Sequence, residues 1–282
     1  MISETSIEDL TAYYESKTQA ILHRYGPGPR VHYHAGLVYE PSPLTTATEL
    51  RSRLRESQQR MLEDAADAWQ LNSVAFRDVL DVGCGLGGGA IFWAHEFGSD
   101  VTAITIAPSH VNLVATFAAE AGVGSQVHPL LCEALEVRGE GRFDAIVAID
   151  SSCHLDRRAW FLRVRELLRP GGRLFIADCF VEQDAYRAPF DRYWCARIGA
   201  PDEYLAAARE AGLLLERRED VSTLVANFWA TTMALIRLEA QNANPSPHES
   251  LRARESLIVH SLMRRGLLDG GLLHLLMSFT KD

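Results

Sequence analysis

The chain has 282 residues, 47% of them hydrophobic and 23% charged, a composition that is ordinary for a globular protein with a full-sized core. Its formal net charge of -9 argues against DNA or bulk RNA as a partner, because proteins that bind the phosphate backbone need a basic face. No stretch approaches the roughly 18 consecutive apolar residues of a membrane span, and the first residues lack the basic-then-apolar layout of a signal peptide. We therefore expect a cytoplasmic protein without stable membrane insertion. We also expect it to form a homo-oligomer.

The five cysteines are odd in number, widely spaced along the chain and contain no C-x-x-C pair. This pattern indicates neither a disulfide framework nor a zinc site. We interpret them as reduced thiols in packed positions.

Residues 1–70 predict a helical cap. Apolar residues recur at helical spacing over 6–25, and Gly26-Pro27 then ends the helix. A second amphipathic helix is predicted over 47–69. The segment 30–36 between them lies among glycine and proline turns, so we expect it to be a loop.

From residue 71 onward, short β-branched or apolar runs alternate with helical stretches. Such alternation predicts right-handed crossovers and a parallel sheet with helices on both faces. The expected strands are 79–82, 100–106, 127–131, 143–149 and 173–180, and the expected helices between them are 88–97, 109–121 and 157–168.

The last third of the chain is less regular. Residues 182–200 show little periodicity and are expected to form a loop or cap insertion. The remainder predicts a helix over 201–212, a strand over 213–221, a helix over 223–238, a polar linker over 241–250, a further helix, and a last strand over 272–281.

The first predicted strand runs directly into Gly83-Cys84-Gly85-Leu86-Gly87, where glycines let the backbone turn sharply and approach a ligand closely. The run also fits the dinucleotide fingerprint. A nicotinamide enzyme, however, would need an acidic residue at the end of the next strand, where Thr105-Ile106 stands. Asp81 and Glu133 instead suit a ligand with an ammonium, a ribose and an adenine but no phosphate.

Together with FDAIVAID at 143–150 and LLRPGGRLFIAD at 167–178, this loop resembles the S-adenosylmethionine (SAM) binding motif of class I methyltransferases. The resemblance implies an α/β Rossmann-like fold over 71–282, with a mostly parallel seven-stranded sheet, an antiparallel last strand and SAM as cofactor. Looser similarities, such as HYHAG at 32–36, extend it to prenyl (geranyl-type) diphosphate C-methyltransferases and, more distantly, to sterol C-methyltransferases.

The resemblance implies a cofactor site in which Gly83 and Gly85 hold the methionine end, Thr105-Ile106 the ribose side and residues 133–135 the adenine side. Some of these residues have an alternative interpretation: His110 as a solvated helix residue, Gln58 as a buried cap for internal backbone, and the segment of Tyr33, His34 and Gly36 as a packed loop. The full set is Tyr33, His34, Gln58, Asp81, Gly83, Gly85, Thr105, Ile106, His110, Glu133, Ala134, Leu135 and Ile149.

Asp150 and His154 are the expected catalytic residues. They follow the predicted strand at 143–149, and the carboxyl ends of parallel strands face the ligand crevice. Methylating an alkene carbon leaves a carbocation that must be stabilised and then deprotonated. Similar C-methyltransferases carry an acidic residue at this position, which implies that role for Asp150. The alternative is that Asp150 caps the segment that follows it.

An isoprenoid acceptor calls for aromatic walls and, if it keeps its diphosphate, for cations and Mg2+. The expected substrate residues are Tyr14, Arg30, His32, Phe180, Trp194, Arg197 and Phe228. Two other functions stay open. An O- or N-methyltransferase of a small secondary metabolite would share every cofactor feature, and a binding protein of the same fold would take up SAM without turnover.

Overall fold

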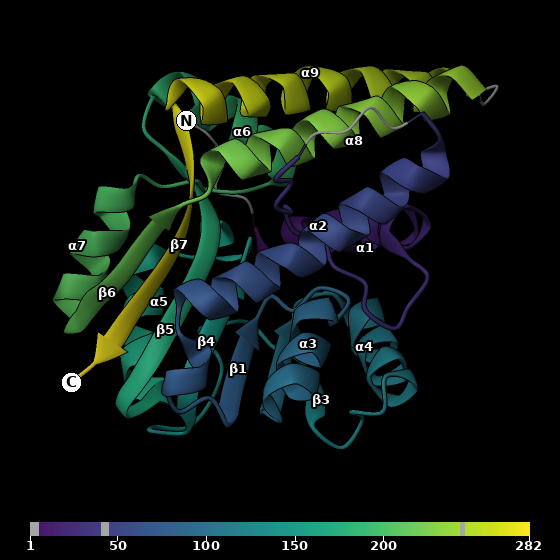
Figure 1. Cartoon of the computed structure of the whole chain (residues 1–282). Helices are drawn as coiled ribbons and strands as arrows, with labels where there is room; N and C mark the ends of the chain where they lie inside the picture. The colour runs from purple at the N-terminus through teal and green to yellow at the C-terminus, as the bar shows by residue number, and fades with distance from the viewer. Residues whose placement is uncertain (1–5, 41–44, 243–245) are drawn as a thin grey trace.

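A seven-stranded sheet in the order β3-β2-β1-β4-β5-β7-β6 forms the centre of the molecule (Figure 1). The computed structural model describes residues 6–40, 45–242 and 246–282. The strands are β1 (Asp78–Val82), β2 (Asp100–Thr105), β3 (Val127–Leu131), β4 (Phe143–Ile149), β5 (Leu168–Val181), β6 (Leu213–Asp220) and β7 (Leu272–Lys281). Only β7 runs antiparallel to its neighbours β5 and β6. The predicted Rossmann-like sheet with an antiparallel last strand is therefore confirmed.

Helices cover both faces of this sheet because its central strands are buried on both sides and read as continuous apolar runs. On one face, α3 (Gly88–Phe97) and α4 (Pro108–Glu120) pack in a core that includes Trp93 and Phe175. On the other, α5 (Arg157–Leu167) and α7 (Pro201–Ala211) pack around Phe161 and Tyr204. The alternation of strands and helices in the sequence thus corresponds to two separate cores.

Five further α-helices of the described chain cover the carboxyl ends of the parallel strands, and one of them, α2, also extends along a face of the sheet, where Trp69 stacks on Phe175 (Figure 1). The five are α1 (Ile7–Tyr25), α2 (Ala47–Ala68), α6 (Arg187–Trp194), α8 (Ser222–Asn242) and α9 (Pro247–Asp269). Helices α8 and α9 lie side by side. Capping boxes at Ser6 with Asp9 and at Thr46 with Glu49 fix where α1 and α2 begin. The helices that cover the carboxyl edge of the sheet therefore come from both ends of the chain and not from residues 1–70 alone.

Two segments are more helical than a loop or a linker would be. The stretch 182–200, expected to be a loop or cap insertion, contains α6, whose C-cap residue Cys195 has a φ of 52°. The expected linker over 241–250 is much shorter, because α8 continues to Asn242 and α9 starts at Pro247; residues 243–245 lie outside the described part of the chain. A serine followed by a proline is a helix start as well as a linker signal, and here Ser246 caps α9.

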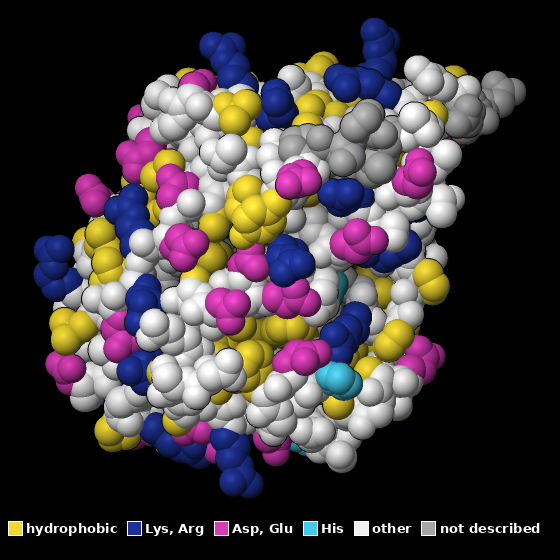
Figure 2. Space-filling model, viewed as in Figure 1, with side chains coloured by type: hydrophobic (Ala, Val, Ile, Leu, Met, Phe, Trp, Pro, Cys, Tyr) yellow, Lys and Arg dark blue, Asp and Glu magenta, His cyan; other side chains and the backbone are white. Residues whose placement is uncertain are grey.

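No helix in the described part of the chain is long and apolar enough to cross a membrane. On the face shown in Figure 2, acidic and basic side chains are intermingled between small hydrophobic patches. This face offers no continuous basic surface to a phosphate backbone.

Candidate functional site

Helix α1 lies across the carboxyl edge of the sheet and is fastened there by one of its faces. The Thr11 hydroxyl donates to the carbonyl oxygen of Ile106 at 3.4 Å, the Ser109 N–H donates to Glu15 Oε1 at 2.9 Å, and Thr18 Oγ1 lies 3.0 Å from His110 Nε2. Because residues 11, 15 and 18 share a helix face, these contacts hold α1 over the end of β2 and the start of α4.

The loops after four neighbouring strands meet at this edge. In the sheet order β3-β2-β1-β4 they begin at Cys132, Ile106, Gly83 and Asp150 respectively. Three contacts link these loops to the ends of the neighbouring strands. Cys84 N–H donates to Ile104 O at 2.9 Å, Cys132 N–H donates to Thr105 O at 3.0 Å, and Ser151 Oγ donates to Val82 O at 2.6 Å. The structure thus brings together loops that are separated in sequence by whole strands and helices.

In the glycine-rich loop Gly83–Gly87, one of the three glycines with a positive φ has free space next to its Cα atom. Gly83, Gly85 and Gly87 all have positive φ angles, of 72°, 54° and 84°. A Cβ atom on Gly83 would come within 2.7 Å of Ser151 Cβ, and one on Gly87 within 2.8 Å of Val114 Cγ1. A Cβ atom on Gly85 would meet nothing within 4 Å, so this glycine faces space that a ligand can occupy.

The side chain of Asp81 is buried two residues before Gly83. Its carboxyl group has no hydrogen-bond partner among the described residues. Burial raises the pKa of its carboxyl group to about 7. A buried carboxylate without a donor suits a cationic ligand group, such as an ammonium.

His110 is also buried, with 2% of its surface exposed, and contacts Thr18. Its interpretation as a solvated helix residue is therefore wrong. On the adenine side expected from the resemblance, Ala134 is buried, Glu133 is half-buried and Leu135 is 44% exposed. That turn therefore offers both a carboxylate and free apolar surface.

Gln58 fixes the backbone of residues 32–35, three of which line the cavity described below. Its amide Nε2 donates to the carbonyl oxygens of His32 and His34, at 3.3 and 2.8 Å, so the side chain caps internal backbone. Gly36 packs against the same helix, where a Cβ atom would lie 2.3 Å from Ser57 Oγ. These contacts fix Tyr33 and His34 as part of the cavity wall.

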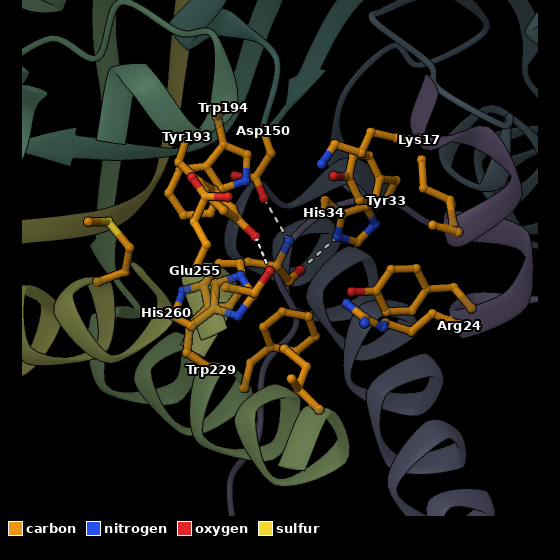
Figure 3. A pocket seen from close by; sticks show the side chains of 18 of the residues that line it. Lys17, Arg24, Tyr33, His34, Asp150, Tyr193, Trp194, Trp229, Glu255 and His260 are labelled. Carbon is orange, nitrogen blue, oxygen red and sulfur yellow. Dashed lines mark hydrogen bonds between the residues drawn. The ribbon is translucent and has the colours of Figure 1, made fainter. Parts of the chain in front are cut away.

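Asp150 follows β4 with a φ of 46°, a left-handed conformation that is uncommon outside glycine. Its Oδ2 accepts the N–H of Ala35 at 2.6 Å (Figure 3). Its Oδ1 lies 3.7 Å from His274 Nε2. The short helix after it has Ser151 at its cap position and no side-chain cap, so the alternative role of Asp150 as a cap is wrong. Burial raises the pKa of Asp150 to about 6.

His154 is held in one tautomer by two neighbours. Its Nδ1 lies 3.3 Å from the carbonyl oxygen of Cys195, and its Nε2 lies 2.7 Å from the Tyr14 hydroxyl. Because a carbonyl only accepts, the network assigns the proton to Nδ1 and leaves Nε2 to accept from Tyr14. Burial lowers the pKa of His154 to about 4, so the ring is neutral at pH 7.

Asp150 and His154 line a cavity of about 890 Å³. Figure 3 shows Asp150 together with other side chains of this lining. Its lining combines a group of aromatic side chains with four basic and five acidic ones. The aromatic residues are Tyr13, Tyr14, Tyr25, Tyr33, Phe190, Tyr193, Trp194, Phe228 and Trp229, the basic ones are Lys17, Arg24, Arg51 and Arg252, and the acidic ones are Asp150, Asp178, Glu239, Glu249 and Glu255. Within the described chain, no group of three or more His, Cys, Asp or Glu side chains is arranged to hold a metal ion.

Residues 79–172, which span β1 to the start of β5, match the family model described as "Methyltransferase domain". This part of the chain is therefore similar to methyltransferase domains. It contains the glycine loop, the turn after β3 and Asp150.

Among solved structures, the whole chain is similar in fold to geranyl diphosphate C-methyltransferase from Streptomyces coelicolor A3(2), with a TM-score of 0.77, 17% identity and 98% of each chain covered. That enzyme was crystallised with Mg2+, geranyl diphosphate and S-adenosyl-L-homocysteine. At this identity the likeness shows the fold alone.

Curated relatives include 27-O-demethylrifamycin SV methyltransferase of Amycolatopsis mediterranei, 33% identical over 60% of this chain and 65% of its own length. Another is tocopherol O-methyltransferase of Arabidopsis thaliana, 31% identical over 51% of this chain and 42% of its own length. The match thus spans less than two thirds of either relative.

Four of the expected substrate residues do not line the cavity beside the methyltransferase domain. Phe180 points into the core on the opposite face of the sheet, because side chains alternate along β5. Arg30 forms an ion pair with Glu96, Arg197 is exposed outside the cavity, and His32 is buried against Gly88. The other three, Tyr14, Trp194 and Phe228, do line it.

Several cavity residues were not predicted from the sequence. Asp178 lies inside β5, one residue beyond the position that pairs with Ile149 at the end of β4, so the strand-end argument applied to Asp150 does not identify it. His274 and His260 carry no local signal, because they reach the cavity from β7 and α9. The His260 ring stacks on Trp229 with centroids 4.7 Å apart, and burial lowers its pKa to about 3.

Proposed function

We propose that the protein is a SAM-dependent methyltransferase whose acceptor is a largely apolar small molecule. The observation that carries this proposal is the position of Asp150. It lines the aromatic cavity, and its neighbour Ser151 packs against Gly83 of the glycine loop. A carboxylate thus stands where a ligand on the glycine loop and an acceptor in the cavity would meet.

The residues around the strand ends fit SAM group by group. Asp81 would pair with the α-ammonium over the space at Gly85, and the adenine would lie on the turn that ends with Leu135. When bound, SAM supplies a methyl group on a positively charged sulfur. The remaining proposed contacts are Tyr33, His34 and Gly83 on the methionine side, Thr105, Ile106 and His110 near the ribose, and Glu133, Ala134 and Ile149 near the adenine.

The chain's own contribution to catalysis is then positioning, exclusion of water and charge stabilisation. Helix α1 covers the strand ends, and the aromatic walls keep water from the acceptor. Asp150 is fixed by Ala35 and presents its other oxygen to the cavity. It can stabilise positive charge that develops on the acceptor and then take a proton from it.

For the acceptor we propose an isoprenoid methylated at an alkene carbon. Rings such as those of Trp194 and Trp229 can steady a carbocation through their π faces. Lys17 and Arg252 replace Arg30 and Arg197 as the cations for a diphosphate, because they line the cavity. Mg2+ is commonly held by one or two carboxylates together with substrate phosphates, so it would arrive with such a substrate.

O-methylation of a phenol or alcohol is the second candidate. One observation favours it: Nε2 of His34 lines the same cavity and is buried without a partner among the described residues. Since Nδ1 of His34 donates to the Ala35 carbonyl oxygen at 2.7 Å, Nε2 is free to accept a hydroxyl proton.

Methyl transfer from labelled SAM to a panel of geranyl diphosphate, farnesyl diphosphate, prenylated phenols and simple phenols tests the proposal. Asp150→Asn keeps the side-chain shape, and asparagine tolerates the positive φ of 46°. We expect product with a prenyl diphosphate and a loss in turnover of about 10² to 10³ in the variant. Methylation of phenols alone would instead establish O-methylation. SAM binding without transfer to any acceptor would contradict an enzymatic role.

A further inference from the structure

His260 is a buried histidine without a hydrogen bond on the inner face of α9. It shares this face with Met263 and Leu267, which are buried in the core. The residue is 5% exposed and lines the cavity, and its Nδ1 has no hydrogen-bond partner in the described chain. An apolar side chain would fill this position without leaving a polar atom unpaired, so a histidine here calls for an explanation.

Three aromatic side chains fix the plane of the His260 ring. The ring stacks on Trp229 with centroids 4.7 Å apart and an interplanar angle of 24°, and it meets Tyr193 edge to face at 5.6 Å. Trp194 lies 6.2 Å away in a similar plane. Tyr193 is itself held by α9, since its hydroxyl lies 2.7 Å from Ser256 Oγ. Stacking occupies a face of the imidazole, and the two nitrogens remain at its edge for a hydrogen bond in the ring plane.

The two nitrogens of His260 differ in their access to the cavity. Nδ1 is fully buried. Nε2 also forms no hydrogen bond with the described residues, but unlike Nδ1 it is not fully buried. Because a buried N–H without an acceptor is rarer than a buried acceptor without a donor, we assign the proton to Nε2. Burial, together with the charges of Arg24 and Lys17, lowers the pKa of His260 to about 3, so the ring is neutral and offers a single N–H to the cavity.

A second donor without an acceptor lies near this N–H. Lys17 of α1 acts on the His260 ring and forms no ion pair with any described residue, whereas Arg24 is paired with Glu239 at 3.8 Å. Glu255 also lines the cavity and favours the charged form of Lys17, but no ion pair joins the two. In Figure 3, His260 and Lys17 lie on opposite sides of the cavity. A ligand group between them would meet two donors, and oxygen is the atom that suits both.

We propose that His260 is a specificity-determining residue whose Nε2–H donates a hydrogen bond to an oxygen of the acceptor's polar head group, which Lys17 also binds. This inference rests on the proposed function, because it assumes an acceptor in the cavity with its methylated carbon beside Asp150. No bond of the acceptor forms or breaks at His260. The residue selects acceptors that carry an oxygen at this end, and by holding that end it limits which carbon reaches Asp150.

Two substitutions at position 260 give opposite expectations for an anchor and for a packing residue. His260→Phe keeps a planar ring on Trp229 but has no donor, whereas His260→Gln loses the ring and places an amide N–H near the position of Nε2. We expect geranyl diphosphate to bind His260→Phe about tenfold or more weakly in calorimetry, because a hydrogen bond to a charged oxygen is lost. His260→Gln should keep most of the wild-type affinity. Wild-type affinity in His260→Phe, with or without a loss in His260→Gln, would overturn the proposal.

Geraniol identifies the oxygen that is bound, since it has the same chain with a hydroxyl group in place of the diphosphate. A loss in His260→Phe that is confined to geranyl diphosphate assigns the hydrogen bond to a phosphate oxygen. A loss with both ligands assigns it to the oxygen that is attached to the chain. Either result supports the anchor.

A spectroscopic readout on the wild type does not depend on how the variants fold. In full-length protein with 15N-labelled histidine, bound geranyl diphosphate should shift the Nε2 resonance of His260. His32 is the control, because it is 4% exposed, has no hydrogen bond at either ring nitrogen among the described residues and does not line the cavity. An unshifted His260 resonance with the ligand bound would overturn the proposal. Absence of both prenyl-ligand binding and methyl transfer in the wild type would instead count against the proposed function.

Discussion

The hydroxyl of Tyr14 lies 2.7 Å from Nε2 of His154 and joins α1 to the turn that follows β4. Tyr14→Phe removes this hydrogen bond and leaves a buried ring nitrogen without a donor. We expect the free energy of unfolding to fall by about 1 to 3 kcal/mol in urea titrations. Tyr39→Phe is the control, because Tyr39 is 59% exposed and its hydroxyl bonds to Asp64 on the surface. Equal losses in both variants would show that the contact between α1 and His154 adds nothing specific.

Gly85 and Gly98 form a matched pair for testing the cofactor site. Both have positive φ angles, of 54° and 66°, and a Cβ atom on either would meet nothing within 4 Å. Alanine at each position should therefore cost a similar amount of stability, about 1 kcal/mol, from the left-handed backbone. Only Gly85→Ala should weaken SAM binding, by tenfold or more in calorimetry, because only Gly85 faces the proposed methionine end. Unchanged SAM affinity in Gly85→Ala would place the cofactor elsewhere.

Trp194 is half-buried and lines the cavity, whereas Trp160 is 1% exposed in the core on the opposite face of the sheet. Trp194→Ala should raise the KM for the acceptor about tenfold and leave SAM affinity unchanged. Trp160→Phe should lower the melting temperature without changing the KM of the remaining folded enzyme. Steady-state kinetics with thermal denaturation distinguishes the two effects. An unchanged KM for the acceptor in Trp194→Ala would show that Trp194 does not contact the acceptor.

Phe228 belongs to both the cavity wall and the core, since its side chain is 1% exposed. Phe228→Ala should therefore weaken acceptor binding and also lower the free energy of unfolding by about 3 to 5 kcal/mol. Urea titration beside the kinetic assay checks both changes. A loss of acceptor binding with wild-type stability would show that Phe228 serves the site alone.

Burial raises the pKa of Asp150 from 3.8 to about 6, so the folded protein binds this proton more tightly than the unfolded chain does. The resulting stability is present below about pH 4 and is lost as the pH rises to about 6. Asp150→Asn removes the cost of the buried charge. The variant should match the wild type near pH 4 and be more stable at pH 8, by up to about 3 kcal/mol at 1.36 kcal/mol per pKa unit. Urea titrations at the two pH values measure the difference, and an equal difference at both would contradict the raised pKa.

The sequence by itself determined the sheet and the position of the glycine loop. Strands such as 143–149 are continuous apolar runs, and the alternation of strands with helices leaves few topologies open. Since parallel strands all end at one edge, the positions of Gly85, Thr105, Glu133 and Asp150 in the chain were enough to predict that they come together. These inferences depend on local patterns and on a general rule of chain connection.

Tertiary structure alone decided which side chains complete the cavity. His274 reaches Asp150 because β7 runs antiparallel, so the start of that strand, and not its end, lies beside the carboxyl ends of β4 and β5. Arg30 and Phe180 were assigned to the substrate from their residue type. Arg30 instead pairs with Glu96, and strand alternation turns Phe180 to the opposite core. The direction in which such a side chain points depends on contacts between segments that are far apart in the chain, as for Arg30 and Glu96, which are more than 60 residues apart. A local sequence pattern cannot predict these contacts.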